Sequence, residues 1–128
     1  MKRLLLWGPA CAYMAVIYYA SSMPGSDLPG HFSDKLAHLL EYAVLGVLFL
    51  VPLADGHLSQ VTGKAAATAV MLSAVYGVFD ELHQAFTPDR TPDVRDLLAD
   101  VLGAALGVVS VLLLRAVVTR VRAARAHE

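Results

Sequence analysis

The chain has 128 residues, of which 57% are hydrophobic and 16% are charged, and its formal net charge is -1. This composition is too apolar and too sparsely charged for an ordinary soluble domain, so it indicates an integral membrane protein. The length suits one compact domain over residues 1–128 and excludes a second. The single cysteine, Cys11, excludes an intrachain disulfide.

The first apolar run, residues 4–20, follows a basic start and predicts a spanning helix, although a secretory signal sequence has the same pattern. Trp7 near one end and Tyr18 near the other favour a retained helix, because aromatic side chains collect at both membrane interfaces. Gly8-Pro9 falls close to the predicted helix start, where a proline is tolerated.

Three more apolar runs follow, at residues 35–54, 64–86 and 93–118. A run of about twenty residues rises roughly 30 Å as a helix, which is enough to cross the hydrocarbon core. Thr91 is predicted to cap the last helix, with Pro92 in its first turn. Gly103-x-x-x-Gly107 predicts close packing against another helix. The sequence therefore predicts an all-α, four-helix transmembrane bundle.

The basic residues predict how this bundle is oriented. Four spans place seven of them on one side and three on the other; the first group is Lys2, Arg3, Lys64, Arg115, Arg120, Arg122 and Arg125, and the second is Lys35, Arg90 and Arg95. The positive-inside rule makes the first side cytoplasmic, so both termini are predicted to be cytoplasmic. The arginines of the tail are interpreted as an anchor near anionic lipid, not as a nucleic-acid site.

Polar residues gather at the opposite, outward ends of the second, third and fourth helices. A charged side chain in a spanning segment costs roughly 2.5–3.5 kcal/mol on insertion scales, so such residues are usually functional or paired. Their helical spacing places them on facing stripes, which predicts one polar pocket that opens outward. The candidate site residues are Asp34, Lys35, His38, Glu41, Tyr42, Tyr76, Asp80, Glu81, His83, Gln84, Arg90, Asp96 and Asp100.

Two pairs in this set have the spacing of metal ligands. His38-x-x-Glu41 and Asp80-x-x-His83 each place a histidine and a carboxylate at i, i+3 on antiparallel helices, as carboxylate bundles do. A structural hydrogen-bond network, a metal or acid–base catalytic site, and a pocket that binds an envelope ligand without chemistry all remain open. The pattern does not decide whether the protein is an enzyme, and it names no cofactor.

The acids near the end of the third helix need a partner. The helix macrodipole opposes Asp80 and Glu81 at that C-terminus, so these carboxylates require Arg90, Lys35, a proton or a cation. Arg90, in the following turn, is predicted to neutralise them and to be more important for stability than an exposed arginine.

Three linked motifs carry a family resemblance: Asp34-Lys35-x-x-His38-x-x-x-Tyr42-x-x-Leu45-Gly46, Tyr76-Gly77-x-x-Asp80-Glu81-x-His83-Gln84-x-Phe86-x-Pro88-x-Arg90, and Asp96-x-x-Ala99-Asp100-x-x-Gly103. Over about residues 31–110 the chain resembles the VanZ-like family of small bacterial membrane proteins. It departs from the family pattern at Asp89, where glycine is common, and at Asp100, where asparagine is frequent.

The resemblance implies a multi-pass protein of the bacterial cytoplasmic membrane with a role in the cell envelope. The family's founding member is associated with resistance to glycopeptide antibiotics, especially teicoplanin. The implied partners are the lipid bilayer and a cell-wall precursor, a glycopeptide or a lipid ligand. Two alternatives are an intramembrane metal-dependent hydrolase or transferase acting on a lipid-linked substrate, and a structural or transporter-associated scaffold.

Overall fold

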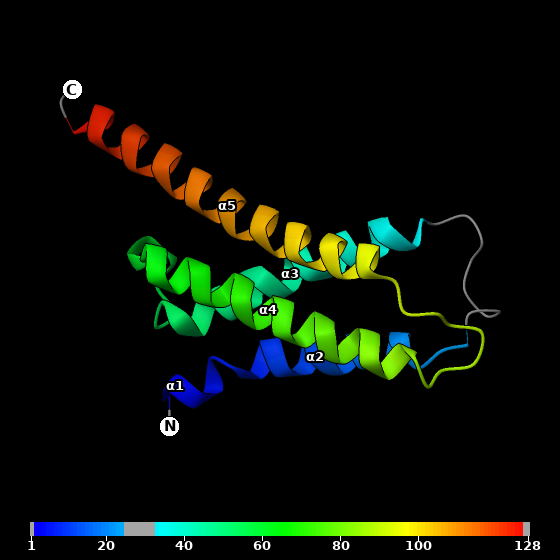
Figure 1. The fold of residues 1–128 in the computed structure, drawn as a ribbon. Coiled ribbons are helices and arrows are strands. Elements are labelled where there is room, and N and C mark those ends of the chain that lie inside the picture. The colour runs from blue at the N-terminus through cyan, green and yellow to red at the C-terminus, as the bar shows by residue number, and fades with distance from the viewer. Residues whose placement is uncertain (1, 25–32, 127–128) are drawn as a thin grey trace.

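The computed structural model describes residues 2–24 and 33–126, and within them every regular element is a helix. The helices are α1 (Lys2–Leu5), α2 (Gly8–Ser21), α3 (Asp34–Leu53), the short 3₁₀ helix η2 (Leu58–Gln60), α4 (Gly63–Gln84) and α5 (Val94–Arg125). Four helical stretches are long and apolar enough to cross a membrane. Figure 1 shows α3 crossing behind α4, α5 along one side of the bundle and α2 beside α4. The prediction of an all-α bundle is confirmed.

The first predicted helix is divided in two. α1 ends at Leu5 and α2 begins at Gly8, with Trp7 in the N-cap position and Pro9 in the first turn of α2. The break falls where the amides of Leu6 and Trp7 bond three residues back. Pro9 has no N–H to continue the helical ladder, so a new helix starts there more easily than an old one continues.

The last helix begins later and ends later than predicted. Asp93, not Thr91, is the N-cap, and its carboxylate accepts a hydrogen bond from the backbone N–H of Arg95 at 2.8 Å. An aspartate oxygen satisfies one of the free amides of the first turn, which explains why the helix starts after this residue. Neither glycine nor proline occurs after Gly107, so α5 continues past residue 118 to Arg125.

Glycines join α3 and α5 with their backbones in contact, as the spacing of Gly103 and Gly107 predicts. A Cβ on Gly103 would lie 2.1 Å from the carbonyl oxygen of Leu39, and one on Gly107 would lie 2.1 Å from that of Ala43. α3 makes its most extensive interface with α5. We call this contact the α3–α5 seam. It fixes the helices that carry much of the polar site.

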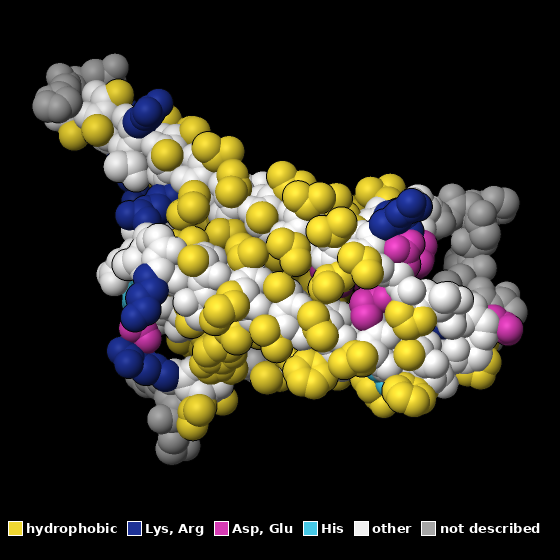
Figure 2. Space-filling view, viewed as in Figure 1, with side chains coloured by type: hydrophobic (Ala, Val, Ile, Leu, Met, Phe, Trp, Pro, Cys, Tyr) yellow, Lys and Arg dark blue, Asp and Glu magenta, His cyan; other side chains and the backbone are white. Residues whose placement is uncertain are grey.

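The lateral surface is apolar and the ends are charged. Figure 2 shows hydrophobic side chains over the visible sides, with most of the visible Lys and Arg at the end where α1 lies and most of the visible acidic side chains at the other end. At the first end Arg3 pairs with Asp55 at 3.0 Å, and Arg115 Nη1 donates to the carbonyl of Val61 at 2.6 Å. This distribution suits a bundle surrounded by lipid, with both ends in water.

The connection from α4 to α5 contains a left-handed residue. Asp89 has φ +57°, a conformation that favours glycine and that aspartate tolerates better than most residues. The departure at position 89 therefore falls where the backbone favours the glycine common in the family.

Candidate functional site

A cluster of buried polar side chains lies where α3 begins, α4 ends and α5 begins. Its buried members are His38, Asp80, Glu81, Gln84, Asp96 and Asp100. Tyr42 is also fully buried, and its ring stacks on that of His38 at a centroid distance of 6.4 Å. Its hydroxyl has no hydrogen-bond partner in the described structure. Buried polar atoms without partners are unusual in folded proteins, so this cluster requires an explanation.

His38 and Asp100 form the centre of the cluster. His38 Nδ1 lies 2.8 Å from Asp100 Oδ1, and both side chains are buried, at 5% and 0% exposure. The other carboxylate oxygen, Oδ2, has no partner among the described residues. Gly77 leaves room for it, because a Cβ there would lie 2.6 Å from this atom. The contact therefore depends on a small residue of α4 as well as on α3 and α5.

Asp80 is held by α2 and by its own helix. Ser21 Oγ donates to Asp80 Oδ1 at 2.5 Å, and Gln84 Nε2 donates to Oδ2 at 3.1 Å. Ser21 is missing from the predicted site because it follows the first apolar run and precedes a segment rich in proline and glycine. A small polar residue ending an apolar helix at the level of the other polar groups is the signal that could have identified it.

Glu81 connects α4 to the start of α5. Its Oε2 accepts the backbone N–H of Asp93 at 2.8 Å, whereas its Oε1 is buried without a hydrogen-bond partner in the described structure. One oxygen of this carboxylate is thus committed to the fold and the other is available.

The two basic residues near the site bind other acids. Arg90 Nη1 lies 3.6 Å from Asp34 Oδ1, and Lys35 Nζ lies 3.0 Å from Asp96 Oδ1 and 3.2 Å from Asp93 Oδ2. Arg90 therefore does not neutralise the acids of α4 as the sequence predicted. The turn carries it back toward α3, and its Nε donates to the carbonyl of Met23.

The cap of α5 is stabilised by charge. The backbone N–H of Arg95 and then the Lys35 ammonium lower the pKa of the Asp93 carboxyl. Because the folded pKa lies below the unfolded one, the contribution to stability is present at neutral pH and is lost as the pH falls through the folded pKa.

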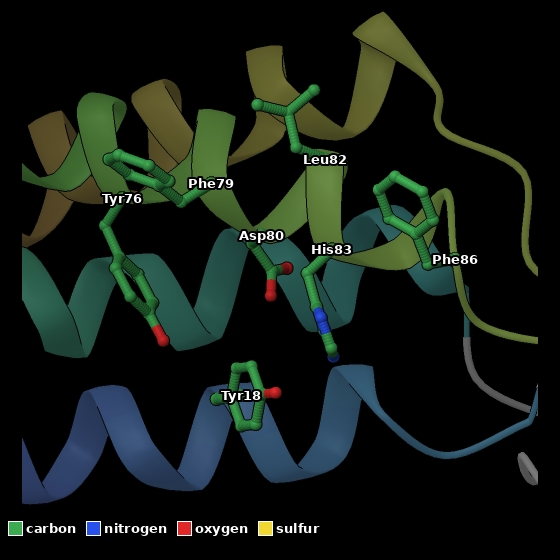
Figure 3. Close-up of a pocket in the computed structure, with 7 residues that line it drawn as sticks. All are labelled: Tyr18, Tyr76, Phe79, Asp80, Leu82, His83 and Phe86. Atoms are coloured by element: carbon green, nitrogen blue, oxygen red, sulfur yellow. The ribbon is translucent and has the colours of Figure 1, made fainter.

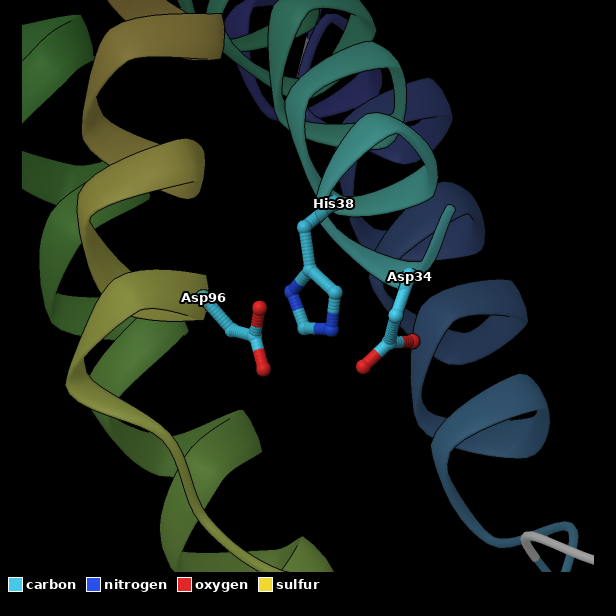
Figure 4. A group of neighbouring side chains, drawn as sticks. All are labelled: Asp34, His38 and Asp96. Atoms are coloured by element: carbon cyan, nitrogen blue, oxygen red, sulfur yellow. The ribbon is translucent and has the colours of Figure 1, made fainter. Parts of the chain in front are cut away.

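Among residues 2–24 and 33–126, two groups of three side chains bring potential metal-ligand atoms within 4.8 Å of one another: Asp34, His38 and Asp96, and His38, Asp80 and Glu81. Figure 4 shows the first group, with the His38 ring between the two carboxylates. His38 and Asp80 belong to the predicted metal set. Glu41 and His83 belong to neither group, and Glu81, the neighbour of Asp80, completes the second.

The other predicted residues lie around this centre. Glu41 is half-buried on α3, and Tyr76 Oη donates to the carbonyl of Met14 at 2.6 Å. His83 stacks on Tyr18 at a centroid distance of 4.3 Å, and its Nε2 lies 2.9 Å from Ser22 Oγ. These last contacts place His83 between α4 and α2.

An open groove of about 460 Å³ lies beside the polar cluster, between α2 and α4. It is lined by Tyr18, Tyr76, Phe79, Asp80, Leu82, His83 and Phe86, which Figure 3 shows. We call it the α2–α4 groove. Its walls are mainly aromatic and aliphatic, and Asp80 and His83 supply its polar groups. Such a groove suits an amphiphile with an apolar chain and a polar head.

Four helices are long and apolar enough to cross a membrane, and polar side chains are buried among them, which is typical of a membrane protein of the all-α class. A family model described as VanZ/LLP1 matches residues 7–115, and the chain belongs to this family. The matched region includes α2, and so extends beyond the three motifs recognised in the sequence. No curated protein and no solved structure matches the chain.

Proposed function

We propose that the protein is a multi-pass protein of the bacterial cytoplasmic membrane that binds a lipid-linked component of the cell envelope. The apolar chain of this component lies in the α2–α4 groove, and its polar head reaches the outward-facing polar cluster. By binding it, the protein lowers susceptibility to glycopeptide antibiotics of the teicoplanin type. The proposal rests on membership of the VanZ/LLP1 family and on the groove.

The position of the groove is the observation that carries the proposal. Phe79, Leu82 and Phe86 are 64%, 57% and 89% exposed, so a lipid chain can reach its wall from the side of the bundle. Asp80 and His83 lie in the same groove, next to the buried cluster. A ligand that is apolar along its length and polar at one end satisfies both parts.

The charges support an outward-facing site. The end with Arg3, Lys64 and Arg115 also carries the arginine-rich end of α5, whereas the polar cluster lies at the opposite end. By the positive-inside rule the first end is cytoplasmic, with both termini. Reporter fusions at the C-terminus and at Asp89 measure this orientation. An external C-terminus contradicts it.

Glycopeptide susceptibility tests the proposed role. We expect the wild-type chain, expressed in a susceptible bacterium, to raise the inhibitory concentration of teicoplanin severalfold. Leu82→Trp should abolish this increase, because the larger side chain fills the groove. Met71→Trp is the matched control, since Met71 is a comparably exposed residue of α4, 58% against 57%, that does not line the groove. Equal activity of the two variants, or no increase with well-expressed wild type, refutes the proposal.

A second candidate is an intramembrane metal-dependent hydrolase or transferase that acts on the same class of lipid-linked substrate. The grouping of His38, Asp80 and Glu81 favours it, because centres with three protein ligands leave a position for water or substrate. Incubation of the purified protein with a labelled polyprenyl phosphate measures this activity. An unchanged substrate, in the presence of added metal, rules out the enzyme for this substrate.

A further inference from the structure

We infer that His38, Asp80 and Glu81 form a binding site for one divalent cation of the Zn²⁺ or Mn²⁺ type. Potential ligand atoms of these three residues lie within 4.8 Å of one another, and all three side chains are buried. α3 supplies the imidazole and α4 supplies both carboxylates. The inference does not depend on what occupies the α2–α4 groove.

The charge balance of the cluster points to a cation. Asp80 and Glu81 are buried acids of α4, whereas Asp100 contacts His38, and Lys35 and Arg90 form their ion pairs with other carboxylates. Buried carboxylates that are ionised without a compensating charge are strongly unfavourable. The sequence predicts Arg90, Lys35, a proton or a cation as the partner of the α4 acids. Because Arg90 and Lys35 bind other carboxylates, a proton or a cation remains.

An unpartnered oxygen within the group is an independent indication of a ligand. Glu81 is only 8% exposed. Its Oε2 accepts a hydrogen bond from the backbone N–H of Asp93, whereas its Oε1 has no hydrogen-bond partner in the described structure. A buried acceptor left without a partner costs about 1–3 kcal/mol, and more when it is charged. A cation bound to this oxygen removes that penalty.

The surrounding contacts orient the three ligands. Asp100 lies at hydrogen-bond distance from His38 Nδ1, so this carboxylate fixes the orientation of the imidazole ring. Ser21 and Gln84 donate to the two oxygens of Asp80. Carboxylates that hold a ligating histidine and donors that hold a ligating carboxylate are the usual support of protein metal sites.

The alternative group around His38 is less suited to a metal. Its acids, Asp34 and Asp96, already pair with Arg90 and Lys35 respectively, and Asp34 is exposed. A divalent ion there would have to compete with these side-chain cations. The group with Asp80 and Glu81 has no such competitor among the described ion pairs.

The ligand types select the class of ion. One imidazole and two carboxylates suit Zn²⁺, Mn²⁺ or Fe²⁺ better than Ca²⁺, which prefers oxygen ligands throughout. Three protein ligands also leave coordination positions open, and Asp80 lies on the wall of the groove. Water or a phosphate oxygen of a ligand in the groove can occupy such a position.

Metal analysis of the full-length protein in detergent tests the site. After treatment with a chelator, the protein is incubated with ZnCl₂ or MnCl₂, freed of excess ion, and analysed for metal content and thermal unfolding. We expect one ion per chain and a higher melting temperature with the ion, because the ion binds the folded state. His38→Gln and Glu81→Gln should each lose the ion.

Matched variants separate this site from the predicted ligand set. Glu41→Gln and His83→Gln change the same residue types on the same two helices outside the group, and both should retain the ion. Asp100→Asn should weaken metal binding about 10–100-fold, as expected for a residue that positions a ligand. The wild-type result is decisive even if a variant does not fold.

A folded wild-type protein that takes up neither Zn²⁺ nor Mn²⁺ overturns the inference, as does full metal content in Glu81→Gln. Loss of the ion in Glu41→Gln or His83→Gln also overturns the assigned ligands. The outcome is distinguishable from that of the proposed function. If the protein binds metal but does not change teicoplanin susceptibility, the metal site stands and the proposed role is refuted. If the protein binds no metal but raises the inhibitory concentration, the role stands and the metal site is refuted.

Discussion

The two sides of the bundle are built differently. At the α3–α5 seam, glycines bring two backbones together, so that an added Cβ at Gly103 or Gly107 would overlap a carbonyl oxygen. Between α2 and α4, the helices are joined by polar contacts such as the bond from Tyr76 Oη to Met14, and a groove of about 460 Å³ stays open. The closed side holds polar side chains in position, and the open side leaves Asp80 and His83 on the wall of the groove.

The largest effect is expected where the closed side is broken. Gly107→Ala should lower stability by about 3 kcal/mol or more, because the Cβ can be accommodated only if α3 and α5 move apart. Gly63→Ala is the control, since a Cβ there meets nothing within 4 Å. Thermal unfolding in detergent measures both. Similar melting temperatures for the two variants contradict a backbone-to-backbone seam.

The pair between Arg90 and Asp34 connects the turn after α4 to the start of α3. Arg90→Ala should cost about 2 kcal/mol, since the arginine side chain is 10% exposed and its half-exposed partner limits the loss. Arg3→Ala provides the comparison, because the Arg3–Asp55 pair is mostly exposed and such pairs contribute about 0–1 kcal/mol. If Arg3→Ala is the more harmful, the Arg90–Asp34 pair does not stabilise the bundle as described.

A smaller loss should follow from weakening the contact between α2 and α4. Tyr76→Phe removes the hydrogen bond to the Met14 carbonyl and should cost about 1 kcal/mol. It should also reduce the effect on teicoplanin susceptibility, because Tyr76 lines the groove. Tyr19→Phe, at a residue that is 71% exposed, should change neither quantity. Unaltered stability of Tyr76→Phe argues against a role for this bond.

The smallest effect is expected in the turn that joins the two sides. Asp89→Gly should change stability by no more than about 0.5 kcal/mol, because glycine adopts the positive φ freely but gains more conformational entropy when unfolded. Asp89→Val should be clearly less stable than Asp89→Gly, since a β-branched side chain disfavours this conformation. Equal melting temperatures for Gly and Val at this position exclude a left-handed residue in solution.

The seam was more predictable than the groove, and the reason is physical. Apolar runs predict helices, and the spacing of Gly103 and Gly107 predicts a helix contact, because both patterns follow the regular repeat of a helix. The sequence predicted Thr91 as the N-cap, but the N-cap is Asp93. Both side chains can accept a hydrogen bond from a backbone N–H, and the fold of the turn decides which of them lies close enough. Similarly, Pro9 predicted the start of a helix, but it did not predict that α1 and α2 are separate helices.

The polar cluster shows what spacing cannot supply. The sequence placed polar groups of three helices at one level, but the partner of Arg90 depends on how the turn after α4 folds back toward Asp34. One residue along a helix is a rotation of about 100°, so the spacing within α4 could not decide whether Glu81 or His83 would approach His38 on α3. Ser21 was not predicted as a site residue, because serine is small and common and Ser21 directly follows the first apolar run.

The length of α5 has a consequence for the surrounding bilayer. About 22 residues separate Asp93 from Arg115, which is roughly 33 Å of helix and close to the thickness of a hydrocarbon core. The charged groups at both ends of this interval favour water, so the helix fits best in a bilayer whose hydrocarbon core has this thickness. In the proposed orientation, a thicker bilayer must thin locally around the protein, and a thinner one must tilt it. If the proposed function holds, a helix that does not line the groove therefore sets the depth at which a lipid head meets Asp80 and His83.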